Sequence, residues 1–387
     1  MTSKKTLYLV VTEKCNLACD YCLYKKNDTV TSLDTAMKGV GLFLNYNRDE
    51  KIIKEIYLFG GEPLLYPTLT KKILLGICGK YSNLIRKGGL KIKILTNGAL
   101  LNQNFYDFMV KITEQFSFPF LEFTISFDGS IQTQDSHRGC GENIVFKIRK
   151  ILEYKKKEGE KLVLGIAWTL TPDRLSSFYT DFLFLFEQLK IHTGFSYLGI
   201  RLADLSNGLN VRGWGKTDIS LIQGETSKVM NYYSTNLLDK NLVIHPINIV
   251  HDMGQKGIQE IHDEYNCINL FNEKCDLGEN ITLLPDGRIT ACCIGRFLDP
   301  IFYENNPLVL CDVNRSNFEK TLDTNLRKIS SLNIHSSIGD KNISGGDYGD
   351  ILKCSNKMCF LLFKKREISL KNEVERAYLN TILGALK

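Results

Sequence analysis

Residues 7–22 read LYLVVTEKCNLACDYC. The apolar run Leu7–Val11 is typical of a buried strand, and the loop after it carries Cys15, Cys19 and Cys22 in the spacing C-x-x-x-C-x-x-C. Cysteine thiolates hold iron–sulfur clusters, and a cluster of four irons normally takes four of them. A loop that supplies only three thiolates would leave one iron open to a ligand that is not protein.

The composition favours a protein of a reducing compartment. The chain has 387 residues and ordinary apolar and charged fractions, which predicts one large domain or two. No signal peptide is recognised at the N-terminus, and no apolar run approaches the roughly 18 residues of a membrane span. Twelve cysteines favour metal or redox use, because disulfides are rare in the cytosol. We therefore expect a cytoplasmic protein without a membrane partner.

The net charge of +6 comes from Lys and Arg residues that are dispersed along the chain. Their densest cluster, Lys155–Lys157, falls at the end of an expected helix and is typical of a solvated face. We therefore expect no nucleic-acid partner.

The first half of the chain alternates strand and helix patterns. Six strands are predicted, at Leu7–Val11, Ile56–Phe59, Lys91–Leu95, Phe123–Phe127, Leu162–Leu170 and Phe195–Leu202. Helices are expected from Ser32 or Asp34, after Pro67 and after Pro172. Such βα units imply an α/β fold with a parallel sheet, either open or curved into a barrel.

Glycines and polar residues follow three further strands. They are Gly60-Gly61-Glu62-Pro63, Asn97-Gly98 and Ser126-Phe127-Asp128-Gly129. Chemistry in parallel sheets lies at the carboxyl ends of the strands. We therefore expect these segments to meet the cysteine loop on one rim.

Together these elements resemble the radical S-adenosylmethionine (SAM) superfamily over roughly residues 5–203. The three-cysteine spacing matches, as do Tyr21 before the third cysteine, the Gly-Gly-Glu-Pro run, and Ser126 with Asp128. The resemblance implies a partial (β/α)6 TIM-like barrel. It also implies that Cys15, Cys19 and Cys22 bind a [4Fe-4S] cluster whose open iron is chelated by SAM.

Further roles follow from the same resemblance. Cofactor contacts are implied for Tyr21, Gly60, Gly61, Glu62, Pro63, Asn97, Ser126, Asp128 and Arg201. The reduced cluster would give SAM one electron, and SAM would break into methionine and a 5′-deoxyadenosyl radical. That radical would abstract a hydrogen atom from the substrate, while the protein positions the partners and excludes water.

The match weakens at the fifth strand, where the family carries a Gly-rich element with a Glu and this chain has GIAWTLTP at residues 165–172. Thr169 and Thr171 could meet the ribose or be plain strand threonines, and the second interpretation is favoured. Arg201 could pair with the SAM carboxylate. The segment His137-Arg138-Gly139 also resembles a family segment, and a structural role for it stays open.

A second cysteine set lies beyond the sixth strand. Apolar alternation broken by Pro285-Asp286-Gly287 predicts a hairpin over residues 281–293. The spacing C-x11-G-x4-C from Cys275 to Cys292 resembles the auxiliary-cluster hairpin of the SPASM and twitch subgroups. The closing cysteine series of a full SPASM domain is absent, so the resemblance implies a twitch-like or reduced SPASM domain.

The resemblance implies one auxiliary [4Fe-4S] cluster in this domain. The expected ligands are Cys275, Cys292, Cys354 and Cys359, with Cys267 as a rival ligand. Cys293 points to the other strand face from Cys292, so only one of the pair should bind the cluster. A structural zinc site is the alternative. Small buried hydrophobic roles are expected for the remaining cysteines, Cys78, Cys140 and Cys311.

Three segments are predicted: a radical SAM partial barrel over residues 1–203, a linker and helical bridge over 204–266, and the auxiliary-cluster domain over 267–387. Helices are expected at Ile219–Leu238 in the second segment and at Asn372–Leu386 in the third. No general acid or base is assigned, because His245, His251, Asp252 and Asp276 each fit a structural role equally well.

The leading functional hypothesis is a radical SAM oxidoreductase that modifies a ribosomally synthesised peptide with a thioether or carbon–carbon crosslink. The alternatives are a twitch-type dehydrogenase of a small-molecule alcohol or of a protein Ser or Cys, and a non-enzymatic iron–sulfur electron carrier. A flavodoxin or ferredoxin is expected as the reducing partner. Since the first strand begins at about Thr6, a fused leader-recognition domain is not expected, and a separate recognition protein would serve a peptide substrate.

Overall fold

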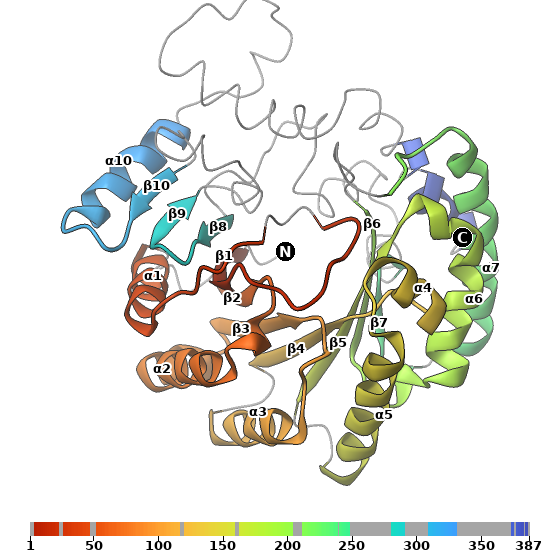
Figure 1. The fold of residues 1–387 in the computed structure, drawn as a ribbon, viewed down its shortest axis with the longest axis horizontal. Coiled ribbons are helices and arrows are strands. Elements are labelled where there is room, and N and C mark those ends of the chain that lie inside the picture. Colours follow the sequence, from red (N-terminus) through yellow and green to blue (C-terminus); the bar gives the residue numbers. More distant parts are fainter. Residues whose placement is uncertain are drawn as a thin grey trace, which may run out of the picture.

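The structure is a computed structural model, in which a curved sheet is lined on its outside by helices (Figure 1). It describes residues 4–22, 26–46, 52–116, 120–158, 162–203, 211–238, 240–247, 280–290 and 309–330, together with 373–374, 377–382 and 384–385.

Within these ranges ten strands form one sheet, in the order β10-β9-β8-β1-β2-β3-β4-β5-β6-β7. The central strands are β1 (Lys4–Thr12), β2 (Ile53–Gly60), β3 (Leu90–Thr96), β4 (Leu121–Ser126), β5 (Val163–Leu170), β6 (Tyr197–Leu202) and β7 (Val243–His245). Each pairs in parallel with the next. The predicted α/β fold with six parallel strands is therefore confirmed, and β7, too short for a periodic pattern, extends it.

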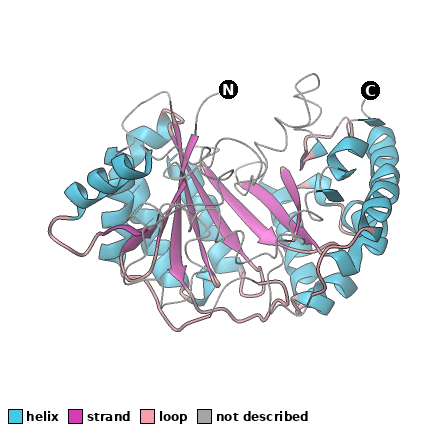
Figure 2. Ribbon diagram, turned by 90° about the horizontal axis from the view of Figure 1, so that it is seen from above, coloured by secondary structure: helices cyan, strands magenta, loops and turns pink. Residues whose placement is uncertain are grey.

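Helices follow the strands and cover the outer face of the sheet (Figure 2). They are α1 (Leu33–Tyr46), α2 (Pro67–Arg86), α3 (Gln103–Phe116), α4 (Ile131–His137), α5 (Gly141–Glu158), α6 (Phe178–Leu183) and α7 (Thr217–Asn236). The Ser32 hydroxyl accepts a hydrogen bond from Thr35 N at 2.9 Å, which explains where α1 begins. After β5 the chain forms a 3-10 turn at Pro172–Ser177 before α6, and a π-helical turn at Phe184–Gln188 after it.

Alternation along each strand separates an apolar outer face from a more polar inner face. Leu7 and Leu9 are fully buried in the main core under the helices, whereas Val10 packs with Phe59 and Leu284 in a small cluster on the other face. This separation explains why strands such as LKIKILT alternate so regularly.

Charged side chains lie on the inner face near the amino ends of the strands. Lys93 Nζ lies 3.1 Å from Glu122 Oε2 and 3.9 Å from Glu55 Oε1, and Lys93 pairs in register with Glu122. All three side chains are mostly shielded from solvent, and Lys93 Nζ also lies 5.2 Å from the centre of the Tyr57 ring. The inner face therefore contains polar groups that a closed hydrophobic barrel would lack.

The predicted hairpin is present and joins the same sheet. It consists of β8 (Asn280–Leu283) and β9 (Arg288–Thr290), and its turn contains Gly287 at φ +97°. β8 pairs in parallel with β1, while β10 (Val309–Asp312) pairs with β9 and is followed by α10 (Phe318–Ser330). The pairing with β8 thus provides hydrogen-bond partners for an edge of β1 that would otherwise be unpaired.

The hairpin also packs against the first helix. A Cβ atom placed on Gly39 of α1 would lie 2.4 Å from Leu283 Cδ2, so this leucine fills the space that the glycine leaves. The predicted division at residues 203 and 267 remains a prediction, but β8 contacts the first segment through both backbone pairing and side-chain packing.

Several sequence-based expectations lie outside the described residues. They concern Cys267, Cys275, Cys292, Cys293, Cys354 and Cys359, the residues His251, Asp252 and Asp276, and residues 204–210, 239 and 248–266 of the bridge. Helical backbone occurs within the predicted C-terminal helix at 373–374, 377–382 and 384–385.

We predict that Leu283→Ala lowers the free energy of unfolding of the whole sheet by about 2–5 kcal/mol, because a fully buried leucine leaves a cavity against α1. Leu238→Ala is the control, since Leu238 is 54% exposed. Urea denaturation followed by circular dichroism measures both. A hairpin that folds independently of the barrel would instead leave the main unfolding transition of Leu283→Ala unchanged.

Candidate active site at the carboxyl ends of the strands

The cysteine loop, residues 13–22, is fastened to the end of β2 by backbone hydrogen bonds. Gly61 N donates to Thr12 O at 2.7 Å, and Glu62 N donates to Lys14 O at 2.9 Å. The start of the loop therefore runs beside the Gly-Gly-Glu-Pro segment, as the convergence of strand ends predicted.

Two glycines allow this close approach. Gly60 has φ +139°, and a Cβ atom on it would lie 2.2 Å from Thr12 O. A Cβ atom on Gly61 would lie 2.2 Å from Lys14 O. The neighbour that requires glycine at both positions is thus the backbone of the cysteine loop, and a contact of these glycines with SAM remains a prediction.

Glu62 is fully buried and accepts three hydrogen bonds from its surroundings. Its Oε1 accepts from Leu64 N at 2.9 Å and from Thr96 Oγ1 at 2.7 Å, and its Oε2 accepts from Asn97 N at 2.7 Å. Burial raises the pKa of Glu62, although these hydrogen bonds oppose the shift. The carboxylate thereby ties the end of β2 to the end of β3.

Asn97 extends the connection from β3 to the cysteine loop. Its Nδ2 donates to Asn16 Oδ1 at 2.9 Å and lies 3.8 Å from Cys15 Sγ, while its Oδ1 accepts from Ala99 N at 3.0 Å. Leu17 N also donates to Cys15 Sγ at 3.4 Å. Cys15 therefore faces two neutral N–H donors.

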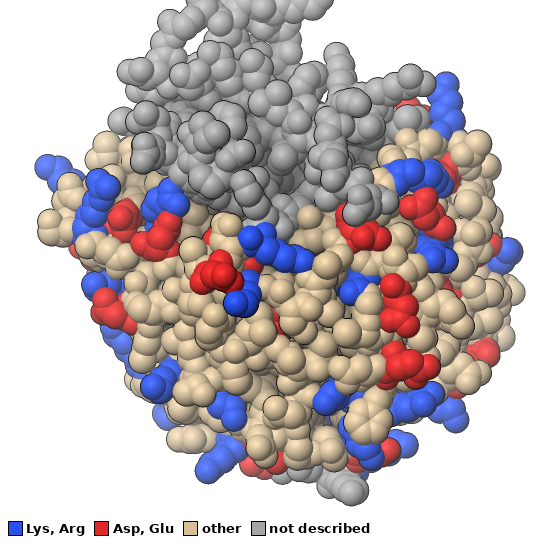
Figure 3. Space-filling view, viewed as in Figure 1, with Lys and Arg blue, Asp and Glu red and all other residues tan. Residues whose placement is uncertain are grey.

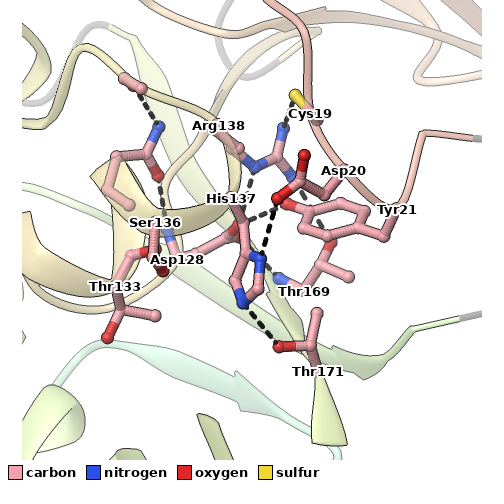
Figure 4. A network of polar contacts seen from close by, with 12 residues as sticks. Cys19, Asp20, Tyr21, Asp128, Thr133, Ser136, His137, Arg138, Thr169 and Thr171 are labelled. Carbon is pink, nitrogen blue, oxygen red and sulfur yellow. Dashed lines mark hydrogen bonds and ion pairs between the residues drawn. The ribbon is translucent and has the colours of Figure 1, made fainter. Parts of the chain in front are cut away.

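Asp128 is the centre of a second network, which follows β4 (Figure 4). Its side chain is 1% exposed, and its Oδ2 accepts from Arg138 Nε at 2.7 Å and from the Tyr21 hydroxyl. Its Oδ1 accepts from Thr169 N of β5 at 2.9 Å, and its backbone N donates to Gln134 Oε1 at 3.0 Å. The carboxylate thus joins the cysteine loop, α4 and β5.

Arg138 directly follows α4 and reaches the cysteine loop. Its Nη1 lies 3.9 Å from Cys19 Sγ, and its Nη2 lies 3.4 Å from Thr169 Oγ1. The guanidinium carbon lies 5.0 Å from the centre of the Tyr21 ring, within the range of a cation–π contact. Figure 4 shows the guanidinium group between Asp128 and the sulfur.

His137, the last residue of α4, holds the same loop from another side. Its carbonyl accepts from Asp20 N at 2.9 Å, its Nδ1 lies 3.5 Å from Asp20 Oδ2, and its Nε2 lies 3.1 Å from Thr171 Oγ1 (Figure 4). The Nδ1 contact is long for a hydrogen bond. The backbone bond is therefore the firmer link between α4 and the loop.

The three thiols of the loop are free and partly buried. Burial raises the pKa of Cys19 to about 11; the Arg138 cation opposes this shift, and the Cys22 and Cys15 thiols add to it. In the part of the chain that the structure describes, no group of three or more His, Cys, Asp or Glu side chains is arranged to hold a single metal ion.

The donor set fits an iron–sulfur cluster better than one metal ion. In a four-iron cluster each thiolate binds a different iron, so the sulfurs need not converge on one point. N–H donors near cysteine sulfurs are the outer contacts that orient and tune such ligands, and both Cys15 and Cys19 have them. Cys15, Cys19 and Cys22 would hold the cluster in this loop.

The remaining predicted contacts lie on the inner face or next to it. Ser126 ends β4 in register with Ala167, and its hydroxyl has no hydrogen-bond partner among the residues that the structure describes. Arg201 is exposed on β6 in register with Thr169. Pro63 begins a 3-10 turn, and its carbonyl accepts from Thr70 Oγ1 at 2.9 Å, which is a local structural role.

Two further predictions concern residues beside the site. The ring of His245, at the end of β7, lies 4.9 Å from the ring of Tyr197, on the inner face. Cys78 and Cys311 are buried, as expected, but the expectation for Cys140 was wrong. Cys140 is exposed, because it lies between two glycines in the turn from α4 to α5 and has φ +62°.

Sequence reasoning missed the part that Arg138 and Thr169 play. In the sequence, the His137-Arg138-Gly139 segment shows only a similarity to a family segment, and the pattern around Thr169 favours a plain strand residue. An arginine ten residues after an aspartate has no periodic signal. The contact arises because α4 turns the chain back toward the end of β4.

Comparison with known proteins gives a match to one family. Residues 9–162 match the family model of the radical SAM superfamily, to which this part of the chain is therefore similar. An uncharacterized protein of Methanocaldococcus jannaschii is 34% identical over 126 residues, which are 32% of this chain and 39% of that protein. The chain thus spans well under half the length of the curated relative that it matches.

Solved structures with the same fold cover most of the chain. One is anSMEcpe with bound AdoMet, at a TM-score of 0.58 and 16% identity, covering 95% of this chain and 99% of the other. Another is Streptococcus suis SuiB bound to the precursor peptide SuiA, at a TM-score of 0.58 and 14% identity, covering 86% and 68%. At these identities the likeness establishes the fold.

Two general properties of the described residues concern membrane-spanning helices and the distribution of surface charge. None of the described helices has the length and apolar character needed to cross a membrane. On the face in Figure 3, acidic and basic side chains of the described residues are interspersed.

We predict that Glu62→Gln removes a component of the pH dependence of stability. Because the pKa of Glu62 is raised above 4.5 in the folded protein, that state binds the proton more tightly than the unfolded chain. The contribution of Glu62 to stability is thus greatest at acidic pH and falls as pH rises from 4.5 through the raised pKa. At pH 7 the free energy of unfolding of the variant should be about 1–3 kcal/mol lower than that of wild type. The reason is that the Gln amide NH₂ group would face the Asn97 N–H, which then has no acceptor.

Urea titrations between acidic and neutral pH measure this effect. Glu142→Gln, at an exposed position, is the matched control and should retain the wild-type pH dependence. The same pH dependence in Glu62→Gln as in wild type would contradict the prediction.

Proposed function

We propose that this protein is a radical SAM enzyme that oxidatively modifies a peptide by hydrogen-atom abstraction. The observation that carries the proposal is the arrangement of the cysteine loop. The ends of β2 and β3 hold it on one side, and Asp128 with Arg138 holds it on the other. The loop lies within the residues that match the radical SAM family model. The family implies SAM and a [4Fe-4S] cluster as cofactors.

When bound, the cluster supplies the electron that cleaves the C5′–S bond of SAM to methionine and the 5′-deoxyadenosyl radical. The protein's own part is positional. Asn97 and Arg138 direct N–H groups at Cys15 and Cys19. Glu62 accepts a hydrogen bond from Asn97 N, and Asp128 accepts one from Arg138 Nε. We assign the direct contacts with SAM to Ser126 and Arg201, which lie on the inner face near the ends of β4 and β6.

The peptide substrate is supported by what similar folds bind. One solved structure is anSMEcpe with bound AdoMet and the Cp18Cys peptide, and SuiB has been solved bound to the precursor peptide SuiA. Both proteins share the fold, at TM-scores of 0.55 and 0.58. For this chain we propose a peptide that gains a thioether or carbon–carbon crosslink, a separate leader-recognition protein, and a flavodoxin or ferredoxin as electron donor.

An auxiliary [4Fe-4S] cluster is part of the same proposal. Closing a substrate radical into a bond releases one electron, and a second cluster can accept it. We propose Cys275, Cys292, Cys354 and Cys359 as its ligands, with Cys267 as the rival. The hairpin β8–β9, whose strands lie between Cys275 and Cys292 in the sequence, supports a cluster-binding segment next to the barrel.

We predict that reconstituted, reduced protein incubated with SAM releases 5′-deoxyadenosine and methionine, measured by liquid chromatography. Cys19→Ala should abolish this release, because the cluster loses one of three thiolates. Cys140→Ala should retain it, since this exposed cysteine lies outside the loop. Wild-type release no greater than that of Cys19→Ala would disprove the radical SAM activity.

We predict about eight irons and eight sulfides per chain after anaerobic purification, as two four-iron clusters require. Cys275→Ala should reduce both to about four and retain the uncoupled cleavage of SAM. Elemental analysis and the 5′-deoxyadenosine assay measure the two properties. About four irons with one zinc in wild type would instead assign the tail as a structural zinc site.

A further inference from the structure

Arg138 is placed to act on one sulfur of the cysteine loop. Its Nη1 lies 3.9 Å from Cys19 Sγ, within the distance at which an N–H group bonds to sulfur. The comparable contact at Cys15 is made by the neutral amide of Asn97, at 3.8 Å. A charged guanidinium group, ion-paired with Asp128, is therefore directed at Cys19, whereas Cys15 receives uncharged donors.

The guanidinium group is held so that its direction is set. Its Nε bonds to Asp128 at 2.7 Å, its Nη2 lies 3.4 Å from Thr169 Oγ1, and one face covers the Tyr21 ring (Figure 4). The side chain of Arg138 is 12% exposed. Because water screens it little, its charge acts on the sulfur more strongly than a surface cation would.

We infer that Arg138 is a positioning residue that raises the reduction potential of the cluster on the three-cysteine loop, acting through Cys19, and that Asp128 serves to orient it. The inference rests on the proposed function. Reduction adds one electron to the cluster and its thiolates, so a charged donor at a sulfur stabilises the reduced state more than the oxidised state. The negative charge of Asp128 opposes this stabilisation of the reduced state. It does so less than a free carboxylate would, because three donors bond to its oxygens.

The test is an anaerobic redox titration of the reconstituted full chain, followed by electron paramagnetic resonance. The signal that changes when SAM is added identifies the cluster of the cysteine loop. Three variants are compared with wild type. Arg138→Gln removes the charge, Arg138→Lys keeps the charge but loses the fork that reaches both Asp128 and Cys19, and Lys26→Gln is the control.

Lys26 is a matched control because it is a cation of the same region that contacts no cysteine sulfur. Its Nζ donates to the backbone carbonyl oxygen of Leu17 in the cysteine loop. Removing it therefore changes the net charge beside the loop by the same amount as Arg138→Gln does.

Arg138→Gln should lower the ratio of reduced to oxidised cluster about tenfold at a fixed applied potential, which is about 59 mV for a one-electron couple. Arg138→Lys should lie between this variant and wild type, and Lys26→Gln should stay close to wild type. Iron content, measured in each sample, normalises the signals. If Arg138→Gln binds too little iron to be titrated, the test is the midpoint potential of Arg138→Lys. It should be lower than that of Lys26→Gln.

Two results would overturn the inference: a wild-type midpoint potential in both Arg138 variants, or an equal shift in Lys26→Gln. In either case the SAM-responsive signal would remain, and the proposed function with it. Absence of that signal from wild-type protein would instead overturn the proposed function and this inference together.

Discussion

The burial of the Asp128 carboxylate is the constraint on which the site depends. A carboxylate with 1% exposure must be compensated by charge and hydrogen bonds, because removing it from water is costly. Its compensation comes from Arg138, the Tyr21 hydroxyl and Thr169 N, which belong to three separate parts of the chain. The pairing that the charge requires is therefore also what places the cysteine loop against the ends of β4 and β5.

The opposite side of the loop is held without a charged pair. At Gly60 and Gly61 the backbone of the cysteine loop comes so close that a Cβ atom would clash with it. Glu62 links β2 to β3 through three hydrogen bonds. The outcome is an asymmetric loop, with neutral donors at Cys15 and a cation at Cys19. Such asymmetry gives the sulfurs of one loop two different electrostatic surroundings.

The continuous sheet joins the hairpin β8–β9 directly to the parallel strands of the barrel. β8 pairs with β1, and Leu283 packs on Gly39, so the hairpin and the first helix share a core. An apolar core surrounds the outer face of this sheet, while the inner face carries Lys93, Glu55 and Glu122. Both properties suit a barrel whose inner face carries polar groups and contributes to a site at the strand ends.

Local sequence was enough to predict the six central strands, the start of α1, the hairpin turn and the convergence of the strand-end segments, because these follow from hydrophobic period, capping residues and glycine. Strand β7 is too short to leave a periodic pattern, and the pairing of β8 with β1 joins residues more than 270 positions apart. The contacts of Arg138 with Asp128 and Cys19 likewise depend on how α4 turns back toward the sheet. Spacing along the chain predicts which residues would bind iron, whereas the largely buried cation beside one of their sulfurs is placed by long-range packing.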